Sequence, residues 1–191
     1  MTRYKNHIVI LLLITGFVYV SQTFPFVSTI VVPQPIPEIE VESEPPPPNP
    51  YLKPTEIECL AKNAYFEAQN QSKTAQIAVM QVVINRVEHD KFGDTICNVV
   101  QHGPTRTGSK GEPVPIRGRC QFSWYCDGKS DEPRDPELYE EIKTLAYAVA
   151  SNDIVIDVTE DSLYYHSTRS YPHWRNAFEK TIVIDDHIFY R

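Results

Sequence analysis

The chain has 191 residues, with 18 basic and 25 acidic side chains and a formal net charge of −7. This charge argues against nucleic-acid binding, which needs a basic face, and against attachment of the domain surface to anionic lipid headgroups. Ten of the 16 prolines fall between residues 25 and 54, and such a segment forms neither helix nor central strand. The composition therefore predicts one folded domain, residues 55–191, near the usual size of about 100–150 residues.

The amino-terminal segment has the pattern of an export signal. Arg3 and Lys5 precede an apolar run from Ile8 to Val20. A basic start before such a run is typical of a secretory signal, and residues 7–32 are also long enough to span a membrane. Since no Ala-x-Ala-like cleavage site follows, we expect a signal anchor, with a cleaved signal peptide or a buried core helix as alternatives. The positive-inside rule then places residues 1–6 in the cytoplasm.

Residues 33–54 are predicted to be a proline-rich linker with four glutamates. Polyproline II rises about 3.1 Å per residue, so this segment would act as a semi-rigid spacer between the bilayer and the domain. The alternative is a ligand for a proline-binding module. The domain is then expected on the periplasmic or cell-wall side of the membrane, or secreted if the amino-terminal segment is cleaved.

Helices come first in the folded part. A capping box at Thr55 and Glu58 predicts the start of one helix, and apolar residues at helical spacing follow it. Ser72 is expected to cap a second helix and Asp94 a short third one. A fourth helix is predicted between the Asp135-Pro136 start signal and Asn152.

Strands come last. Residues 102–119 contain glycine, proline and four basic side chains and are expected to form an exposed loop. Residues 180–184 and 187–190 are predicted to pair as a hairpin around Asp185-Asp186. Helices followed by strands indicate an α+β domain, mostly helical with a small C-terminal antiparallel β-sheet.

Four cysteines lie in the exported part, at positions 59, 97, 120 and 126. An even number in such a domain predicts two disulfide bonds, and three pairings are possible. Zinc is the competing explanation, but the sequence contains no C-x-x-C pair.

Glu67 is the candidate catalytic residue. On the helical wheel it borders the apolar stripe beside Leu60. A carboxyl group at the mouth of an apolar surface is partly desolvated, which raises its pKa and keeps it protonated near neutrality. A general acid acting on a glycosidic oxygen needs that property, although most glutamates in such positions are solvated flanking charges.

Six short sequence words occur in chain order: Ala64-Tyr-Phe-Glu67-Ala68, Val83-Ile-Asn85-Arg86-Val87, Asp94-Thr-Ile-Cys-Asn-Val-Val100, Cys120-Gln121-Phe122-Ser123-Trp124, Tyr164-Tyr165-His166 and His187-Ile-Phe-Tyr190. Together they resemble the SleB-type cell wall hydrolases, which include spore-cortex-lytic enzymes, over about residues 57–191. The resemblance implies a lysozyme-like fold and cleavage of glycan strands between N-acetylmuramic acid and N-acetylglucosamine, with lytic transglycosylase activity. The family's catalytic glutamate, in its Tyr-x-Glu-Ala word, falls on Glu67.

The sequence departs from the family where Glu-Ala-Arg-Gly-Glu is expected. Here the word continues Glu67-Ala68-Gln69-Asn70-Gln71, so an amide replaces the second carboxylate. A transglycosylase needs only one acid. A hydrolytic lysozyme would need a second carboxylate, for which Asp127 is the best candidate, although a loop aspartate is more often a turn residue.

Gln121, Ser123, Tyr165 and His166 are candidates for substrate binding, because glycan subsites use amides, hydroxyls and aromatic faces. We expect no metal and no cofactor. His166, His173 and His187 raise the alternative of a zinc-dependent amidase that cuts the peptide from muramic acid. A non-catalytic, spanin-like envelope protein is a further alternative. A bacteriophage lysis protein and a bacterial wall-remodelling enzyme both fit the main interpretation.

Overall fold

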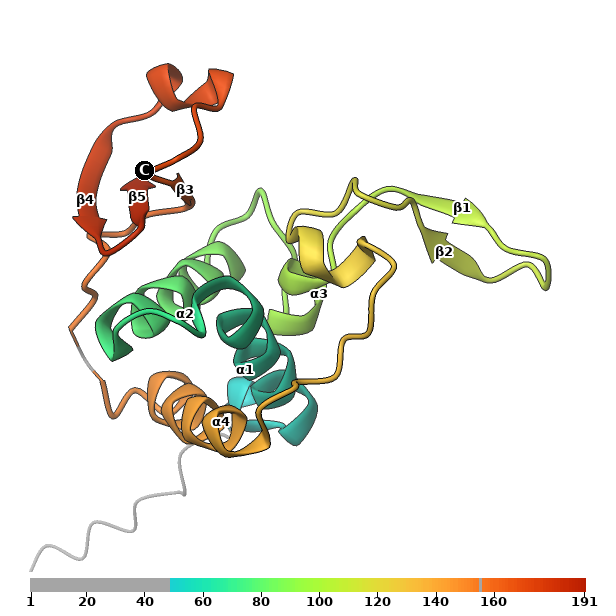
Figure 1. Ribbon diagram of the computed structural model, residues 1–191, viewed down its shortest axis with the longest axis horizontal. Coiled ribbons are helices and arrows are strands. Elements are labelled where there is room, and N and C mark those ends of the chain that lie inside the picture. The colour runs from blue at the N-terminus through green and yellow to red at the C-terminus, as the bar shows by residue number, and fades with distance from the viewer. Residues whose placement is uncertain (1–48, 155) are drawn as a thin grey trace, which may run out of the picture. The chain divides into compact units, whose positions relative to one another are not determined.

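The computed structural model describes residues 49–154 and 156–191. Helices occupy the first part of this region and a three-stranded antiparallel sheet the last, so the prediction of a mostly helical α+β domain is confirmed (Figure 1). The predicted signal anchor and most of the predicted linker lie outside the described residues. Within those residues, no helix combines the length and the apolar character needed to cross a bilayer.

The folded part includes residues that the sequence assigned to the linker. The Asn49 side chain accepts a hydrogen bond from the Tyr51 amide at the start of the 3₁₀ helix η1 (Pro50–Leu52). Its Nδ2 donates to the carbonyl oxygen of Ala150, 2.9 Å away. Tyr51 and Leu52 also pack against the helical core. These contacts tie the end of the linker to the last turn of the fourth helix.

Four helices follow: α1 (Pro54–Ala68), α2 (Lys73–Val87), α3 (Ile96–Val100) and α4 (Pro136–Ala150). Ser72 and Asp135 cap α2 and α4 through their side chains, as predicted. Asn152 closes α4 with a positive φ of 63°, which is also as predicted.

Two predicted caps are wrong. Helix α1 starts at Pro54, one residue before Thr55, because a proline at the first helical position has the required φ and lacks only an amide that would be unpaired anyway. The Thr95 hydroxyl caps α3 by accepting from the Asn98 amide, whereas the Asp94 carboxylate binds the Asn98 side chain.

Helix α1 lies at the centre of the helical part and contacts α2, α3 and α4. Leu60, Ala61 and Ala64 on its inner face are fully buried, and the two alanines allow the neighbouring helices to approach closely. Ile142 and Ala146 of α4 pack into the same cluster.

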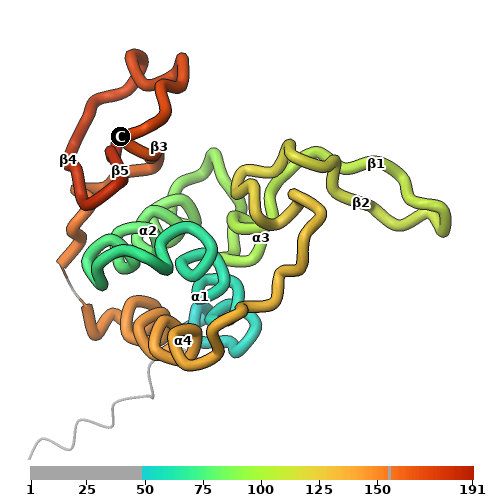
Figure 2. The backbone as a smooth tube through the Cα atoms, in the orientation of Figure 1, coloured from blue at the N-terminus to red at the C-terminus, as the bar shows by residue number. Residues whose placement is uncertain are grey.

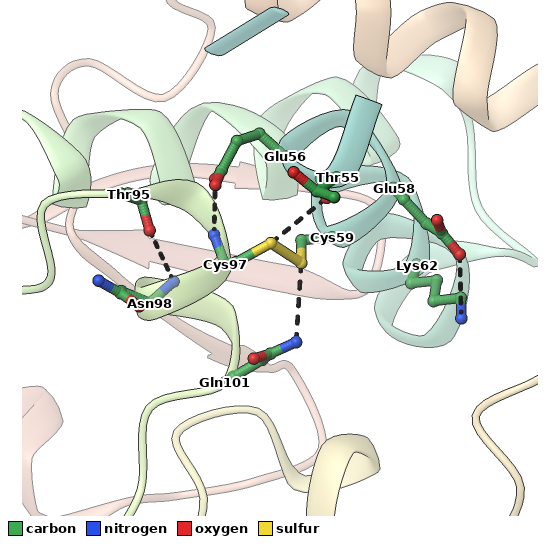
Figure 3. The surroundings of a disulfide bond; sticks show 9 residues. All are labelled: Thr55, Glu56, Glu58, Cys59, Lys62, Thr95, Cys97, Asn98 and Gln101. Atoms are coloured by element: carbon green, nitrogen blue, oxygen red, sulfur yellow. Dashed lines mark hydrogen bonds and ion pairs between the residues drawn. A yellow bond between two sulfur atoms is a disulfide. The ribbon is translucent and has the colours of Figure 1, made fainter. Parts of the chain in front are cut away.

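The two predicted disulfide bonds are present, and the structure resolves their pairing. Cys59 pairs with Cys97, which joins α1 to α3 (Figure 3). The Glu56 carboxylate strengthens this junction by accepting a hydrogen bond from the Cys97 amide at 2.9 Å. Cys120 pairs with Cys126 and closes a short loop that contains Gln121 and Ser123.

The exposed segment before Cys120 is a β-hairpin, where the sequence predicted a loop. Strands β1 (Thr105–Thr107) and β2 (Pro113–Pro115) pair antiparallel, with Arg106 opposite Val114. Figure 2 shows the hairpin extending away from the helices. All three residues of β1 are exposed, so the prediction of an exposed segment holds and only its regular pairing was missed.

The C-terminal sheet has the order β3-β5-β4, formed by β3 (Tyr164–Ser167), β4 (Lys180–Ile184) and β5 (His187–Tyr190). The predicted hairpin around Asp185-Asp186 is confirmed, and Asp185 has a φ of 47° in the turn. A second buried cluster holds the sheet on α2: Ala75, Ala78, Val82, Ile184 and Phe189.

Candidate active site

Glu67 lies in the last turn of α1, where the helix meets the sheet. Ala64 and Ala68 on either side are buried against the core and fix the orientation of this turn. The Glu67 side chain reaches a cavity of about 400 Å³, and its Oε2 accepts a hydrogen bond from the Tyr165 hydroxyl at 3.3 Å. Residues 98 positions apart in the chain therefore meet at this carboxyl group.

The surroundings of Glu67 favour its protonated form. Burial raises the pKa of this carboxyl above its ordinary value, and the hydrogen bond from Tyr165 and the positive charge of Arg86 offset only part of that rise. In the described part of the chain, Glu67 forms no ion pair. A carboxyl group that has a raised pKa and faces a cavity can act as a general acid.

The structure brings the other four predicted site residues to the same cavity. Its wall includes Gln121, Ser123, Tyr165 and His166 together with Glu67. They come from the disulfide-closed loop, from the start of the 3₁₀ helix η2 (Ser123–Cys126) and from strand β3.

The loop that carries Gln121 and Ser123 is held from three sides. The backbone amide of Gln121 donates a hydrogen bond to the His102 carbonyl oxygen at 2.8 Å. Phe122, between the two polar residues, is only 4% exposed. The Cys120–Cys126 bond closes the loop behind them. Anchoring the apolar Phe122 leaves its two polar neighbours at the cavity wall.

Tyr165 packs beneath the carboxyl group of Glu67. Its ring lies against Phe122, His187 and Phe189, with centroid distances of 6.5, 5.1 and 5.6 Å. Burial of its hydroxyl, followed by the nearby Glu67 carboxylate, raises the pKa of Tyr165 well above the ordinary value. The hydroxyl therefore keeps its proton and donates a hydrogen bond to Glu67.

His166 is buried between its own strand and the end of β5. Its Nε2 lies 3.0 Å from the Tyr190 hydroxyl and its Nδ1 lies 2.8 Å from the Ser167 carbonyl oxygen. His173 stands apart in the 3₁₀ helix η3 (His173–Ala177), and His187 lines the cavity. Across residues 49–154 and 156–191, no three histidine, cysteine, aspartate or glutamate side chains are grouped as a metal site would require.

A second hollow of about 520 Å³ is also lined by Glu67. It shares Glu67 and Ser123 with the first cavity and continues along Phe66 and Trp124, whose rings stack at 4.8 Å. Asp127 lines this hollow, but its side chain accepts from the Lys129 amide and pairs with the Lys129 ammonium group at 3.2 Å. Glu67 and Ser123 therefore line both hollows.

Several residues that the sequence did not propose as catalytic or substrate-binding also line the cavity, among them Gln71, Arg86 and Asp186. Gln71 accepts a hydrogen bond from the Asp186 amide at 3.2 Å, and Asp186 pairs with Arg169 at 3.4 Å. Arg86, at the end of α2, is only 3% exposed. The one available signal for Arg86 was its charge within the apolar word Val83-Ile-Asn85-Arg86-Val87.

Comparisons with known proteins agree with this architecture. The model of a family described as Cell Wall Hydrolase matches residues 70–190, a segment that begins three residues after Glu67. No curated protein matches the chain.

Two solved structures are similar in fold. The catalytic domain of the germination-specific lytic transglycosylase SleB from Bacillus anthracis is 24% identical, with a TM-score of 0.53, and the match covers 76% of this chain and all of that one. The catalytic domain of the Bacillus cereus SleB protein is 22% identical, with a TM-score of 0.54, and the match covers 75% of this chain and 94% of that one.

Proposed function

The chain belongs to the cell wall hydrolase family, and from this premise we propose that it cleaves peptidoglycan glycan strands between N-acetylmuramic acid and N-acetylglucosamine as a lytic transglycosylase. The observation that carries the proposal is the Glu67 carboxyl group, which lines two hollows of the surface and whose pKa is raised by burial. The SleB structures, one of which is described as a lytic transglycosylase, share the fold.

In the proposed reaction, Glu67 acts first as an acid and then as a base. Its proton passes to the glycosidic oxygen, and the C1–O bond of the muramic residue breaks. The resulting Glu67 carboxylate takes the proton of the C6 hydroxyl of the same sugar, and the C6 oxygen forms a bond to C1. The products are a 1,6-anhydro-muramic end and a free 4-hydroxyl on the leaving glucosamine, so neither water nor a protein nucleophile is consumed.

The other carboxylates of the two hollows are placed differently from Glu67. Each of the three forms an ion pair with a lysine or arginine: Asp127 with Lys129, Glu132 with Lys62, and Asp186 with Arg169. The hydrogen bond from the Lys129 backbone amide lowers the pKa of Asp127, so this carboxyl group is a poor acid near neutrality. This arrangement favours a mechanism with a single acid over a hydrolytic mechanism with two carboxyl groups.

The test is digestion of purified sacculi with product masses recorded. We expect the full chain to release 1,6-anhydro-muropeptides and the Glu67→Gln variant to release none. Glu58→Gln is the matched control, because Glu58 lies on the same helix and its side chain is 55% exposed. Full activity of Glu67→Gln would refute the assignment of the acid.

The product masses also separate the alternatives. Reducing muramic ends would indicate a hydrolytic lysozyme that uses a second carboxylate. Release of intact stem peptides, abolished by a chelator, would indicate the zinc amidase. Binding to sacculi without any turnover would indicate a non-catalytic envelope protein.

We also propose that residues 7–32 anchor the enzyme in the membrane and that residues 33–54 space the domain from it. The support is the basic start, the apolar run and the proline density of the sequence. Alkaline extraction of membranes from cells that express the full chain tests the proposal. An anchored chain stays in the pellet at full length, and a shortened chain in the soluble fraction would indicate a cleaved signal.

A further inference from the structure

A third, smaller cavity, the aromatic cavity, adjoins the cavity of about 400 Å³ that Glu67 lines, which we call the Glu67 cleft. It measures about 290 Å³ and shares Arg86, Gln121 and Tyr165 with the cleft. Three further aromatic side chains complete it: Tyr164, Trp174 and Phe178. Tyr164 and Phe178 stack at a centroid distance of 4.1 Å, and Trp174 lies 5.9 Å from Tyr164. The cavity thus has aromatic walls and, among its lining residues, one charged group.

That charged group, the guanidinium of Arg86, is held rigidly. Its Nε donates to the Leu163 carbonyl oxygen at 2.7 Å. Its central carbon lies 5.2 Å from the ring centroid of Phe92 and 5.3 Å from that of Phe122. Cation–π contacts of this kind hold the guanidinium group in place.

Part of the Arg86 guanidinium lacks a hydrogen-bond partner. Its Nη1 is buried and finds no acceptor among the described residues, and no carboxylate of that part of the chain pairs with it. Burial lowers the pKa of Arg86, yet an arginine keeps its charge in proteins. A buried, charged donor without an acceptor is costly, and such groups in native structures normally have a partner.

Glu67 does not supply that partner. The two side chains line the same cleft but form no ion pair, and the Glu67 carboxyl group is already bonded to Tyr165. Burial also favours the neutral form of Glu67 in the resting enzyme. The side-chain amide of the nearby Gln121 is a second group that can donate from the same wall.

We propose that Arg86 and the aromatic cavity form a subsite that binds a carboxylate of the substrate. The inference rests on the proposed function, because the carboxylate is one carried by peptidoglycan. Two sources share this chemistry: the lactyl group of a muramic residue without its peptide, and the peptide stem itself. The aromatic walls would hold the apolar face of the ligand while Arg86 binds its charge.

The experiment measures binding without turnover. The full-length Glu67→Gln chain is titrated with N-acetylmuramic acid and with its carboxamide, which has the same shape but no charge. The indole resonance of Trp174 reports on the aromatic cavity, and that of Trp124 reports separately on the hollow that Phe66 and Trp124 line. We expect the acid to bind roughly tenfold more tightly than the amide or better, as for a charge-assisted hydrogen bond, and to shift the Trp174 signal.

A second substitution tests the role of Arg86. Glu67→Gln/Arg86→Gln should lose the preference for the acid, whereas Glu67→Gln/Arg175→Gln should keep it. Arg175 is the matched control because it also lies over an aromatic ring, Tyr171, but lines neither cavity. Equal affinities for acid and amide, a preference that survives Arg86→Gln, or a preference that leaves the Trp174 signal unmoved would overturn the proposal. The comparison of the two ligands needs no Arg86 variant and stands if that variant fails to fold.

Competition identifies the source of the carboxylate. Displacement of N-acetylmuramic acid by glycan strands stripped of peptides, but not by free stem peptide, assigns the site to the lactyl group, and the converse assigns it to the stem. Displacement by neither overturns the proposal. Because all readouts are binding, a failure of the glycan-cleavage proposal shows up separately, in the digestion of sacculi.

Discussion

The burial of Glu67 makes the stability of the folded chain depend on pH. Burial raises the pKa of this carboxyl group, so the folded chain keeps a proton at pH values where the unfolded chain has lost it. The free energy of unfolding therefore falls as the pH rises through the window from the ordinary pKa of a glutamate to the raised pKa of Glu67. Below that window both states are protonated, and the penalty disappears.

We therefore predict that Glu67→Gln is more stable than the native chain above this window and equally stable below it. The gain should be about 1.4 kcal/mol for each unit by which the pKa is raised. Urea unfolding of both chains at neutral pH and at a pH below the ordinary glutamate value measures the difference. A gain of the same size at both pH values would show that the stabilisation has another cause.

The hydroxyl of Tyr165 is one of the groups that shift the pKa of Glu67, after burial. Its hydrogen bond stabilises the carboxylate form and so lowers the pKa of Glu67. Removing this bond in Tyr165→Phe should raise that pKa, and the alkaline limb of the pH–activity profile should move upward by up to about one pH unit. Phe122→Leu tests the packing contribution separately, since it loosens the ring contact but keeps the hydroxyl. An alkaline limb that does not move in Tyr165→Phe would contradict this role of the hydrogen bond between Tyr165 and Glu67.

At the level of single residues, the sequence pointed to Glu67 but not to Arg86. Helical spacing alone puts Glu67 at the border of an apolar stripe, because that property is local to one helix. The unsatisfied edge of Arg86 depends on which carbonyl and which rings surround it, and these come from distant segments. No periodicity within α2 contains that information.

The two disulfide bonds differ in the length of chain that they close and in the elements that they join. Cys59–Cys97 spans 38 positions and joins two core helices, whereas Cys120–Cys126 spans six and closes the loop that carries Gln121 and Ser123. In the chain-entropy view, the longer loop contributes about 4 kcal/mol to the free energy of unfolding and the shorter one about 2 kcal/mol.

We predict that the two cysteine pairs, each replaced by serines, rank in opposite order for their effects on stability and on activity. Loss of Cys59–Cys97 should lower the melting temperature more, and loss of Cys120–Cys126 should lower the rate of glycan cleavage more. Thermal unfolding and sacculus digestion at a temperature where both variants are folded measure the two effects. An activity that follows the melting temperature in both variants would show that the short loop has no separate role at the site.

Prediction of elements succeeded where the signal was short-range. Ser72 and Asp135 cap their helices as expected, since a cap depends on three or four neighbouring residues. At α1 two local signals competed, and Pro54 determined the start in place of Thr55. The β1–β2 hairpin escaped prediction because its strands have three residues each and no alternation of apolar and polar side chains.

In the molecule as a whole, the candidate site lies where the sheet meets the helices. Glu67 belongs to the helical part and Tyr165 to the sheet, and their bond crosses this junction. Phe189 of β5 contacts the Tyr165 ring and belongs to the cluster that packs on α2. The sequence could list the parts of the site, but their meeting depends on this packing between segments far apart in the chain.

The role of this junction in activity can be tested with two core substitutions that should lower the free energy of unfolding by similar amounts. Phe189→Leu loosens the contact between sheet and α2, and Ile142→Val trims the helical core at α4; both side chains are essentially inaccessible, at 0% and 1% exposure. Each change should lower the free energy of unfolding by about 1 kcal/mol. Only Phe189→Leu should also lower cleavage per folded molecule, because it lets Tyr165 move away from Glu67. Denaturant unfolding paired with sacculus digestion measures both quantities, and equal activity of the two variants would mean that the site tolerates movement of the sheet.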